Sequence, residues 1–146
     1  MTTTPAFAPD DLRAIAERMR DLDVGILTTR DGSGVASRPM SNNGQVEYDG
    51  DTWFFAPRDG GAARQIEADA AVGLGYSATE RGIWVAMEAE AEIDDDPDHK
   101  RERWFEDLRQ WFPDGPDDPA VVLIRVRATR VRAWGRDGDL DVRRGS

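Results

Sequence analysis

The chain has 146 residues, a length that suits one domain, residues 1–146, with a hydrophobic core of its own. Its 29 acidic residues against 19 lysines and arginines give a formal net charge of −10, so unspecific binding to nucleic acid is not expected. The lack of cysteine and the single histidine exclude disulfides, thiolate catalysis, cysteine-rich zinc sites and a multi-histidine metal site within one chain.

The sequence also argues against targeting and membrane segments. Met1 to Pro9 lacks the basic and apolar regions of a signal peptide, and no apolar run approaches the roughly 20 residues that cross a bilayer. We therefore expect a cytoplasmic protein without a membrane partner. The lone His99 lies in the charged run DDDPDHKRER, which favours a solvated helix start over a catalytic triad.

The first third of the chain predicts a helix, a strand and a turn. Apolar residues from Leu12 to Met19 recur at the spacing of one helix face, with Asp10 or Asp11 available as a cap. The run Val24 to Thr29, VGILTT, is apolar and β-branched, which indicates a mostly buried strand. Residues 30–34, RDGSG, then predict a turn.

The stretch Val35 to Pro57 predicts a hairpin around which the rest is organised. The strand Val35 to Met40 is expected to join the aromatic strand Thr52 to Ala56 through residues 48–51, because Asp-Gly tolerates the positive φ of tight turns. The first strand carries one cation, Arg38. A cation opposite an aromatic strand can bind a flat anionic ligand; the alternative is an ordinary hairpin with a surface arginine.

Helical and extended patterns follow from residue 58 onwards. A short helix is predicted from about Gly61 to Ala68, and its N-terminus suits either a phosphate or a plain strand-to-helix turn. Val72 to Ala78 indicates a strand. Ile83 to Ile93 alternates apolar residues with glutamates at 88, 90 and 92, the pattern of a strand with one buried face.

The last third predicts a helix and a long bent strand. Pro97 to Phe112 reads as a helix whose aromatic stripe packs in the core or on another subunit. The strand Val121 to Trp134 changes its apolar phase midway, which places a bulge near Thr129 and Arg130. The polar end, Gly135 to Ser146, is expected to be a flexible tail, as is Met1 to Pro9.

Together these elements predict a mainly-β fold. Six or seven strands in mostly hairpin order, three short helices and no βαβ rhythm are typical of a small antiparallel β-barrel with peripheral helices.

The order and spacing of SRPM, DGDTWFF and WFPDG resemble the pyridoxamine 5'-phosphate oxidase-like split barrels, and most of all their bacterial general stress protein branch. The resemblance covers roughly Leu12 to Trp134. It implies a homodimeric, six- to seven-stranded antiparallel split β-barrel. It also implies a flavin mononucleotide (FMN) in a groove at each end of the subunit interface.

The resemblance further implies which residues hold the cofactor. Arg38 would contact the phosphate or ribityl region, with Pro39 and Met40 near the ring. Phe55 and Ala56 would line the flavin from a second strand, and Trp111 would belong to the dimer contact near the pocket. The full set of implied cofactor-binding residues is Ser37, Arg38, Pro39, Met40, Asn43, Phe55, Ala56, Arg58, Arg64 and Trp111.

The phosphate turn departs from the family pattern. The usual hydroxyl residue and lysine, or arginine-lysine pair, fall on Gly60, Gly61 and Ala62, with the lysine position at Ala62. Losing two charge-assisted hydrogen bonds costs about 3–6 kcal/mol, for which Arg58 and Arg64 are the available compensation.

Three functions therefore stay open. The first is an FMN-dependent oxidoreductase of unknown substrate, and the second is a non-catalytic, stress-related flavin-binding protein. The third is a split barrel that has lost FMN and binds a deazaflavin, another small planar anion, or nothing. Pyridoxamine-phosphate oxidase activity itself is not expected, because the chain is short and has no second basic cluster for a substrate phosphate.

Overall fold

The computed structural model describes residues 6–42 and 47–145. Its strands are β1 Val24–Asp31, β2 Gly34–Ser41, β3 Asp51–Pro57, β4 Ala71–Ala78, β5 Ile83–Asp94, β6 Val121–Gly135 and β7 Leu140–Arg143. Its α-helices are α1 Pro9–Met19, α2 Gly61–Ala68 and α3 Pro97–Arg103, and two short 3₁₀ helices, η1 and η2, cover Thr79–Arg81 and Glu106–Gln110. No helix within these ranges is long and apolar enough to cross a membrane.

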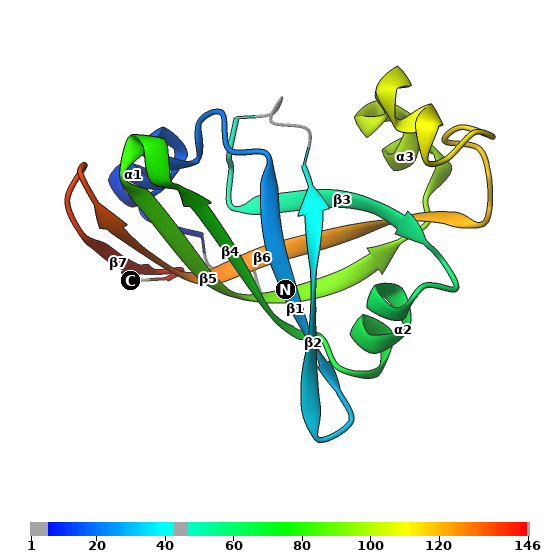
Figure 1. Cartoon of the computed structure of the whole chain (residues 1–146), viewed down its shortest axis with the longest axis horizontal. Coiled ribbons are helices and arrows are strands. Elements are labelled where there is room, and N and C mark those ends of the chain that lie inside the picture. The colour runs from blue at the N-terminus through cyan, green and yellow to red at the C-terminus, as the bar shows by residue number, and fades with distance from the viewer. Residues whose placement is uncertain (1–5, 43–46, 146) are drawn as a thin grey trace.

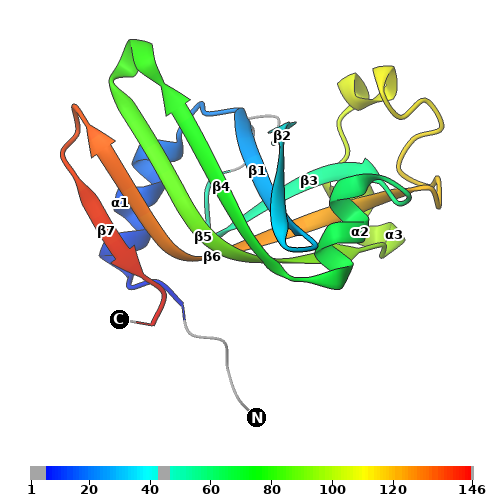
Figure 2. The ribbon, with the colours of Figure 1, turned by 60° about the horizontal axis from the view of Figure 1, so that its bottom comes forward.

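All strand pairs are antiparallel, in the order β2-β1-β4-β5-β6-β3, with β7 added to β6. The mainly-β prediction is therefore confirmed. The sheet curls but does not close, because β2 pairs with β1 and β3 pairs with β6, and the two end strands do not pair within the described residues. Helix α1 lies at one end of the molecule, and α2 and α3 lie at the other (Figure 1, Figure 2).

The predicted hairpin of Val35–Met40 with Thr52–Ala56 is wrong. β2 instead pairs with β1 across the two-residue loop Gly32–Ser33, where Gly32 has a φ of +60°. β3 pairs with β6, more than 60 residues further along the chain. Two residues separate β1 from β2, which suits a tight hairpin turn, whereas nine residues separate β2 from β3.

The predicted bulge is confirmed. Glu88 of β5 faces Arg130, whereas Ala89 faces Ala128, so Thr129 is the extra residue on β6. The Thr129 hydroxyl donates to the Glu88 carbonyl oxygen at 3.0 Å and so satisfies the disturbed ladder. The bulge lets β6 bend and pair with β5 over its length, with β3 near one end and β7 near the other.

The predicted helix from Pro97 to Phe112 is interrupted. α3 ends at Arg103, and residues 104 and 105 are extended before η2 begins. At this break the Trp104 ring makes a tertiary contact, packing edge-on against Phe55 with centroids 5.5 Å apart. Of the predicted aromatic stripe, Leu108 is buried, whereas Trp111 is 65% exposed.

The described parts of both predicted tails, residues 6–9 and 135–145, take part in the fold. β7 pairs with residues 130–133 of β6, and the Arg130 guanidinium binds the Asp141 carboxylate at 2.7 Å. At the other end Phe7 is buried, and the guanidinium of Arg144 lies 4.8 Å from its ring centroid. Alternating apolar residues in β7 pack on the core, which outweighs the polar composition of this segment.

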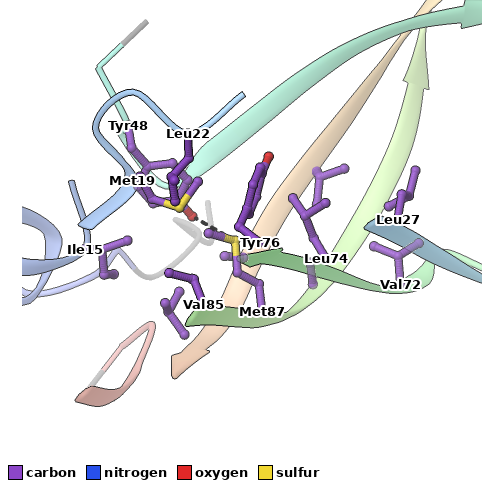
Figure 3. Packing of buried hydrophobic residues seen from close by; sticks show 14 of the residues in the cluster. Ile15, Met19, Leu22, Leu27, Tyr48, Val72, Leu74, Tyr76, Val85 and Met87 are labelled. Carbon is purple, nitrogen blue, oxygen red and sulfur yellow. Dashed lines mark hydrogen bonds between the residues drawn. The ribbon is translucent and has the colours of Figure 1, made fainter. Parts of the chain in front are cut away.

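The core fills the concave side of the sheet. Figure 3 shows side chains of α1 meeting those of β4 and β5, with the Tyr48 hydroxyl donating to the Met87 sulfur at 3.8 Å. The Tyr76 hydroxyl accepts from the Asn42 amide at 3.0 Å. Burial raises the pKa of both tyrosines, so their hydroxyls stay protonated and polar within an apolar surround.

Gly135 supplies a test of how tightly β5 and β6 meet at the open end of the barrel. It has a φ of +120°, and an added Cβ would overlap the Gly82 carbonyl oxygen. We expect Gly135→Ala to lower the free energy of unfolding by about 2–6 kcal/mol, the sum of backbone strain and overpacking. Urea denaturation measures this loss.

Gly32→Ala is the matched control for Gly135→Ala. Gly32 also has a positive φ, but a Cβ there meets nothing within 4 Å. Its loss should be about 1–2 kcal/mol from backbone strain alone. Equal losses in the two variants would contradict the close approach of residues 82 and 135.

Candidate functional site

The two ends of the open sheet meet at a cavity of about 270 Å³. Strand β2 contributes one wall, β3 contributes the facing wall, and the start of α2 forms the floor. The lining residues are Arg38, Met40, Phe55, Ala56, Pro57, Gly60, Gly61 and Ala62. The curl of the sheet thus brings Arg38 beside the aromatic strand, as expected from the sequence, although the two strands are not paired.

Alternation along β2 decides which of its residues reach the cavity. Arg38 and Met40 point toward it, whereas Ser37 and Pro39 lie on the opposite, exposed face. The Ser37 hydroxyl shares a 2.8 Å hydrogen bond with the Thr28 hydroxyl on that outer face. The implied set of Ser37 to Met40 is therefore split between two faces of one strand.

The guanidinium of Arg38 is held by three acceptors. Nη1 donates to the Thr29 hydroxyl at 3.0 Å and to the Leu27 carbonyl oxygen at 3.2 Å, and Nη2 donates to Gln65 Oε1 at 2.8 Å. The Thr29 hydroxyl also donates to Gln65 Oε1, so β1, β2 and α2 are tied together at this point. Arg38 is consequently fixed in position before any ligand arrives.

Two properties make Arg38 a candidate anion-binding group. None of the ion pairs within residues 6–42 and 47–145 involves it, and its three hydrogen bonds use three of its five N–H donors. Burial lowers the pKa of the guanidinium, an effect that the charge of Asp31 opposes. A half-buried cation without a carboxylate partner gains most from an anion that enters the cavity.

The first turn of α2 adds a second source of positive potential. Gly60 is the N-cap, and no side chain caps the helix. The first amides of a helix have no partner inside the helix, and the helix dipole is positive at this end. The small residues 60–62 line the cavity at this end of the helix. Ala62, at the position where a lysine is usual, contributes no charge.

The other implied residues lie outside this cavity. The Arg58 guanidinium donates to the Pro119 carbonyl oxygen at 3.0 Å and binds the exposed Asp95 carboxylate at 2.9 Å. Arg64 is exposed on α2 and does not line the cavity, and neither does Trp111. Asn43 lies outside the described residues.

Sequence reasoning missed the residues that position Arg38. The sequence assigns Thr29 only to a buried strand and Gln65 only to a short helix. Their polar side chains signal a partner only once the fold shows that they are buried or half-buried beside a cation. No spacing in the sequence connects positions 29, 38 and 65.

Comparison with known proteins assigns the chain to a family. Residues 10–142 match the model of the family described as pyridoxamine 5'-phosphate oxidase like. The chain belongs to this family. No curated protein matches the chain significantly.

Solved structures of this pyridoxamine 5'-phosphate oxidase-like fold superpose over most of the chain. General stress protein 26 from Bacillus anthracis is 20% identical, with a TM-score of 0.74 over 92% of this chain and 96% of that one. The general stress FMN/FAD binding protein from Xanthomonas citri is also 20% identical, with a TM-score of 0.74 over 91% of this chain and 94% of that one. An FAD-binding protein from Mesorhizobium loti is 18% identical, with a TM-score of 0.63 over 80% of this chain and 88% of that one. The split-barrel fold expected from the sequence is confirmed.

Proposed function

We propose that the protein binds a flavin, FMN in the first instance, with the phosphate between Arg38 and the N-terminus of α2. The observation that carries this is Arg38 itself, a pre-positioned cation without a carboxylate partner in a cavity whose other walls are apolar. The structural relatives described as FMN/FAD-binding and FAD-binding support the choice of a flavin.

The residues present fit such a cofactor in kind. An apolar wall next to the cation is formed by Met40, Phe55 and Ala56. A flavin has a charged phosphate at one end and an apolar ring system at the other, so it suits a cation beside an apolar wall. A cavity of about 270 Å³ is smaller than most cofactor sites, which are roughly 300–1,000 Å³. It holds part of a flavin, so the remainder needs a further surface.

We propose an oxidoreductase of this flavin-binding type. Bound flavin would supply the hydride or electron transfer, and the protein would supply binding, orientation and exclusion of water. The described residues around Arg38 include no histidine, carboxylate or lysine positioned for proton transfer in the cavity. Their role is therefore to hold and orient the cofactor.

A second candidate rests on Gly60, Gly61 and Ala62. Because these residues carry no charged side chain, the cavity suits a ligand that needs only one cation, such as a deazaflavin or another planar anion. A stress-related binding protein without turnover would use the same cavity. Reduction of the bound flavin by NADH or NADPH separates it from the oxidoreductase.

We also propose a homodimer formed through the outer face of the sheet. Val24 and Ile26 of β1 are exposed there, and Ile26 lies in a row with Pro39, Gly75 and Ala86 on the neighbouring strands. Such small and apolar neighbours make a flat surface that a second copy can cover. Ser37 shares this face, so it would lie at the dimer contact in this arrangement.

The flavin site is tested by Arg38→Gln in a titration with FMN, followed by flavin fluorescence and by thermal shift. We expect the dissociation constant to rise about 10- to 100-fold, the effect of one charge-assisted contact. Thr29 and Gln65 keep their mutual hydrogen bond, so the apoprotein should stay folded.

Arg64→Gln is the matched control, since it removes an equal charge from an exposed position on α2 outside the cavity. It should change the affinity less than threefold. Equal weakening in both variants would contradict the placement of the phosphate. A wild-type protein that FMN neither binds nor stabilises would instead favour the deazaflavin or planar-anion alternative.

Ala62→Lys tests the missing charge directly. The new ammonium group would enter the cavity at the first turn of α2, and FMN should bind about tenfold or more tightly. The apoprotein should lose about 0.3–1 kcal/mol, because a cation is unfavourable at a helix N-terminus. Ala68→Lys, at the exposed end of the same helix, should show neither effect. Unchanged affinity in Ala62→Lys would place the phosphate elsewhere.

Ile26→Glu tests the dimer. The side chain is 48% exposed in the single chain, so a glutamate there should leave the fold intact but charge the proposed contact. Light scattering during gel filtration should give twice 16.3 kDa for the wild type and 16.3 kDa for the variant. Ala120→Glu, exposed and away from this face, should remain dimeric. A monomeric wild type would refute the proposal.

A further inference from the structure

A second and larger cavity, of about 660 Å³, lies beside the start of β3. Its walls come from the end of α1 and the turn after it, from residues 47–49, from β3 and from the end of α3. Phe55 lines both this cavity and the one that holds Arg38. The two cavities are therefore neighbours that share Phe55, and no other lining residue of the larger one belongs to the proposed phosphate site.

Aromatic rings form one wall of this larger cavity. Trp53 and Phe55 follow each other along one face of β3, and Phe105 adds a third ring. The Arg103 guanidinium lies 3.7 Å from the centroid of the Trp53 ring. The Arg125 guanidinium lies 5.4 Å from the same centroid, so Trp53 is already engaged by two cations of the protein itself. Phe55 and Phe105 make no such contact among the described residues, and they are the rings on which a ligand can stack.

The charged lining is dominated by carboxylates. It contains five acidic residues, Asp21, Glu47, Asp49, Asp51 and Glu102, against two arginines, Arg20 and Arg103. Asp51 is paired with Arg125 at 2.7 Å, and Glu102 is paired with Arg103 at 3.6 Å. Neither Asp21 nor Glu47 takes part in an ion pair among the described residues. The cavity next to Arg38 has the opposite character, with one cation and no carboxylate.

Asp21 and Thr52 bring two further polar groups to this cavity. Asp21 has a φ of +65° and turns its residue into the lining immediately after α1. Thr52 is 5% exposed and lines the cavity, and its hydroxyl has no hydrogen-bond partner within the described part of the chain. A buried hydroxyl without a partner is costly, although Thr52 lies on the face of β3 opposite to Trp53 and Phe55.

We propose that the larger cavity binds a flat aromatic cation, such as a protonated aminated ring or an N-alkylated heteroaromatic ring. Its carboxylates attract the positive charge, its rings stack on the planar body, and both features reject a phosphorylated or carboxylated molecule. As the substrate of a redox reaction, this cation would lie next to the flavin, a role that rests on the proposed function; the binding preference does not.

The test compares two probes of the same shape and opposite charge, 9-aminoacridine and acridine-9-carboxylate. Each is titrated into the wild-type protein, with and without FMN, and the probe fluorescence is followed. We expect the cation to bind at least tenfold more tightly than the anion, and to bind without displacing FMN. Equal binding of the two probes, or displacement of FMN by the cation, would overturn the proposal.

Paired substitutions separate this site from the general attraction of an acidic protein for cations. Asp21→Asn with Glu102→Gln removes two carboxylates from the cavity, and the affinity for 9-aminoacridine should fall about tenfold. Glu90→Gln with Asp139→Asn removes the same charge from exposed positions outside it, and should leave the affinity within twofold. Equal losses in both pairs would overturn the proposal.

The flavin titration and the acridine titration test the two proposals separately, so either proposal can be refuted while the other stands. A protein that binds 9-aminoacridine at Asp21 and Glu102 but not FMN would contradict the proposed function and keep this site. A protein that binds FMN without distinguishing the two acridines would keep the function and remove the site.

Discussion

The contact of Arg38 with Thr29 and Gln65 is the interaction on which the candidate site depends. β2 and β3 are the two ends of an open sheet, and no backbone ladder joins them among the described residues. The hydrogen bonds of Arg38 therefore replace the missing backbone pairing, because they attach the edge strand β2 to α2, the helix that follows β3 in the chain. The same bonds fix the cation at the rim of the opening. Structural closure and ligand recognition thus share one side chain.

The curl that brings those ends together originates in β6. Its bulge at Thr129 keeps the strand paired with β5 on both sides of the bend, so one strand carries β3 near one end and β7 near the other. The bulge costs one ladder position, which the Thr129 hydroxyl repairs through the Glu88 carbonyl oxygen. Without that bend β3 would lie far from β2, and Arg38 would be the surface arginine that the alternative interpretation of the sequence describes.

Local patterns predicted the elements well and their partners poorly. The range of α2, the alternation of β5 and the bulge of β6 depend on side chains close in sequence, and each matched the structure. The partner of β3 did not, because its pairing with β6 joins segments more than 60 residues apart. The same limit applies to Arg58, whose contacts with Asp95 and Pro119 come from two distant loops. The residues alone pointed to Arg38 as the one cation of its strand, and the family resemblance gave Phe55 its role, whereas Thr29 and Gln65 required the fold.

The two cavities that meet at Phe55 differ in charge, and this difference follows from where each is built. The smaller one lies between a strand edge and a helix N-terminus, so backbone amides and one guanidinium set its potential. The larger one lies among turns, where acidic residues collect because aspartate tolerates the conformations that turns require. An anionic group and a cationic one can therefore be held in neighbouring cavities whose charged lining residues differ. A chain with a net charge of −10 can keep an anion site here because no carboxylate is among the described residues that line the cavity around Arg38.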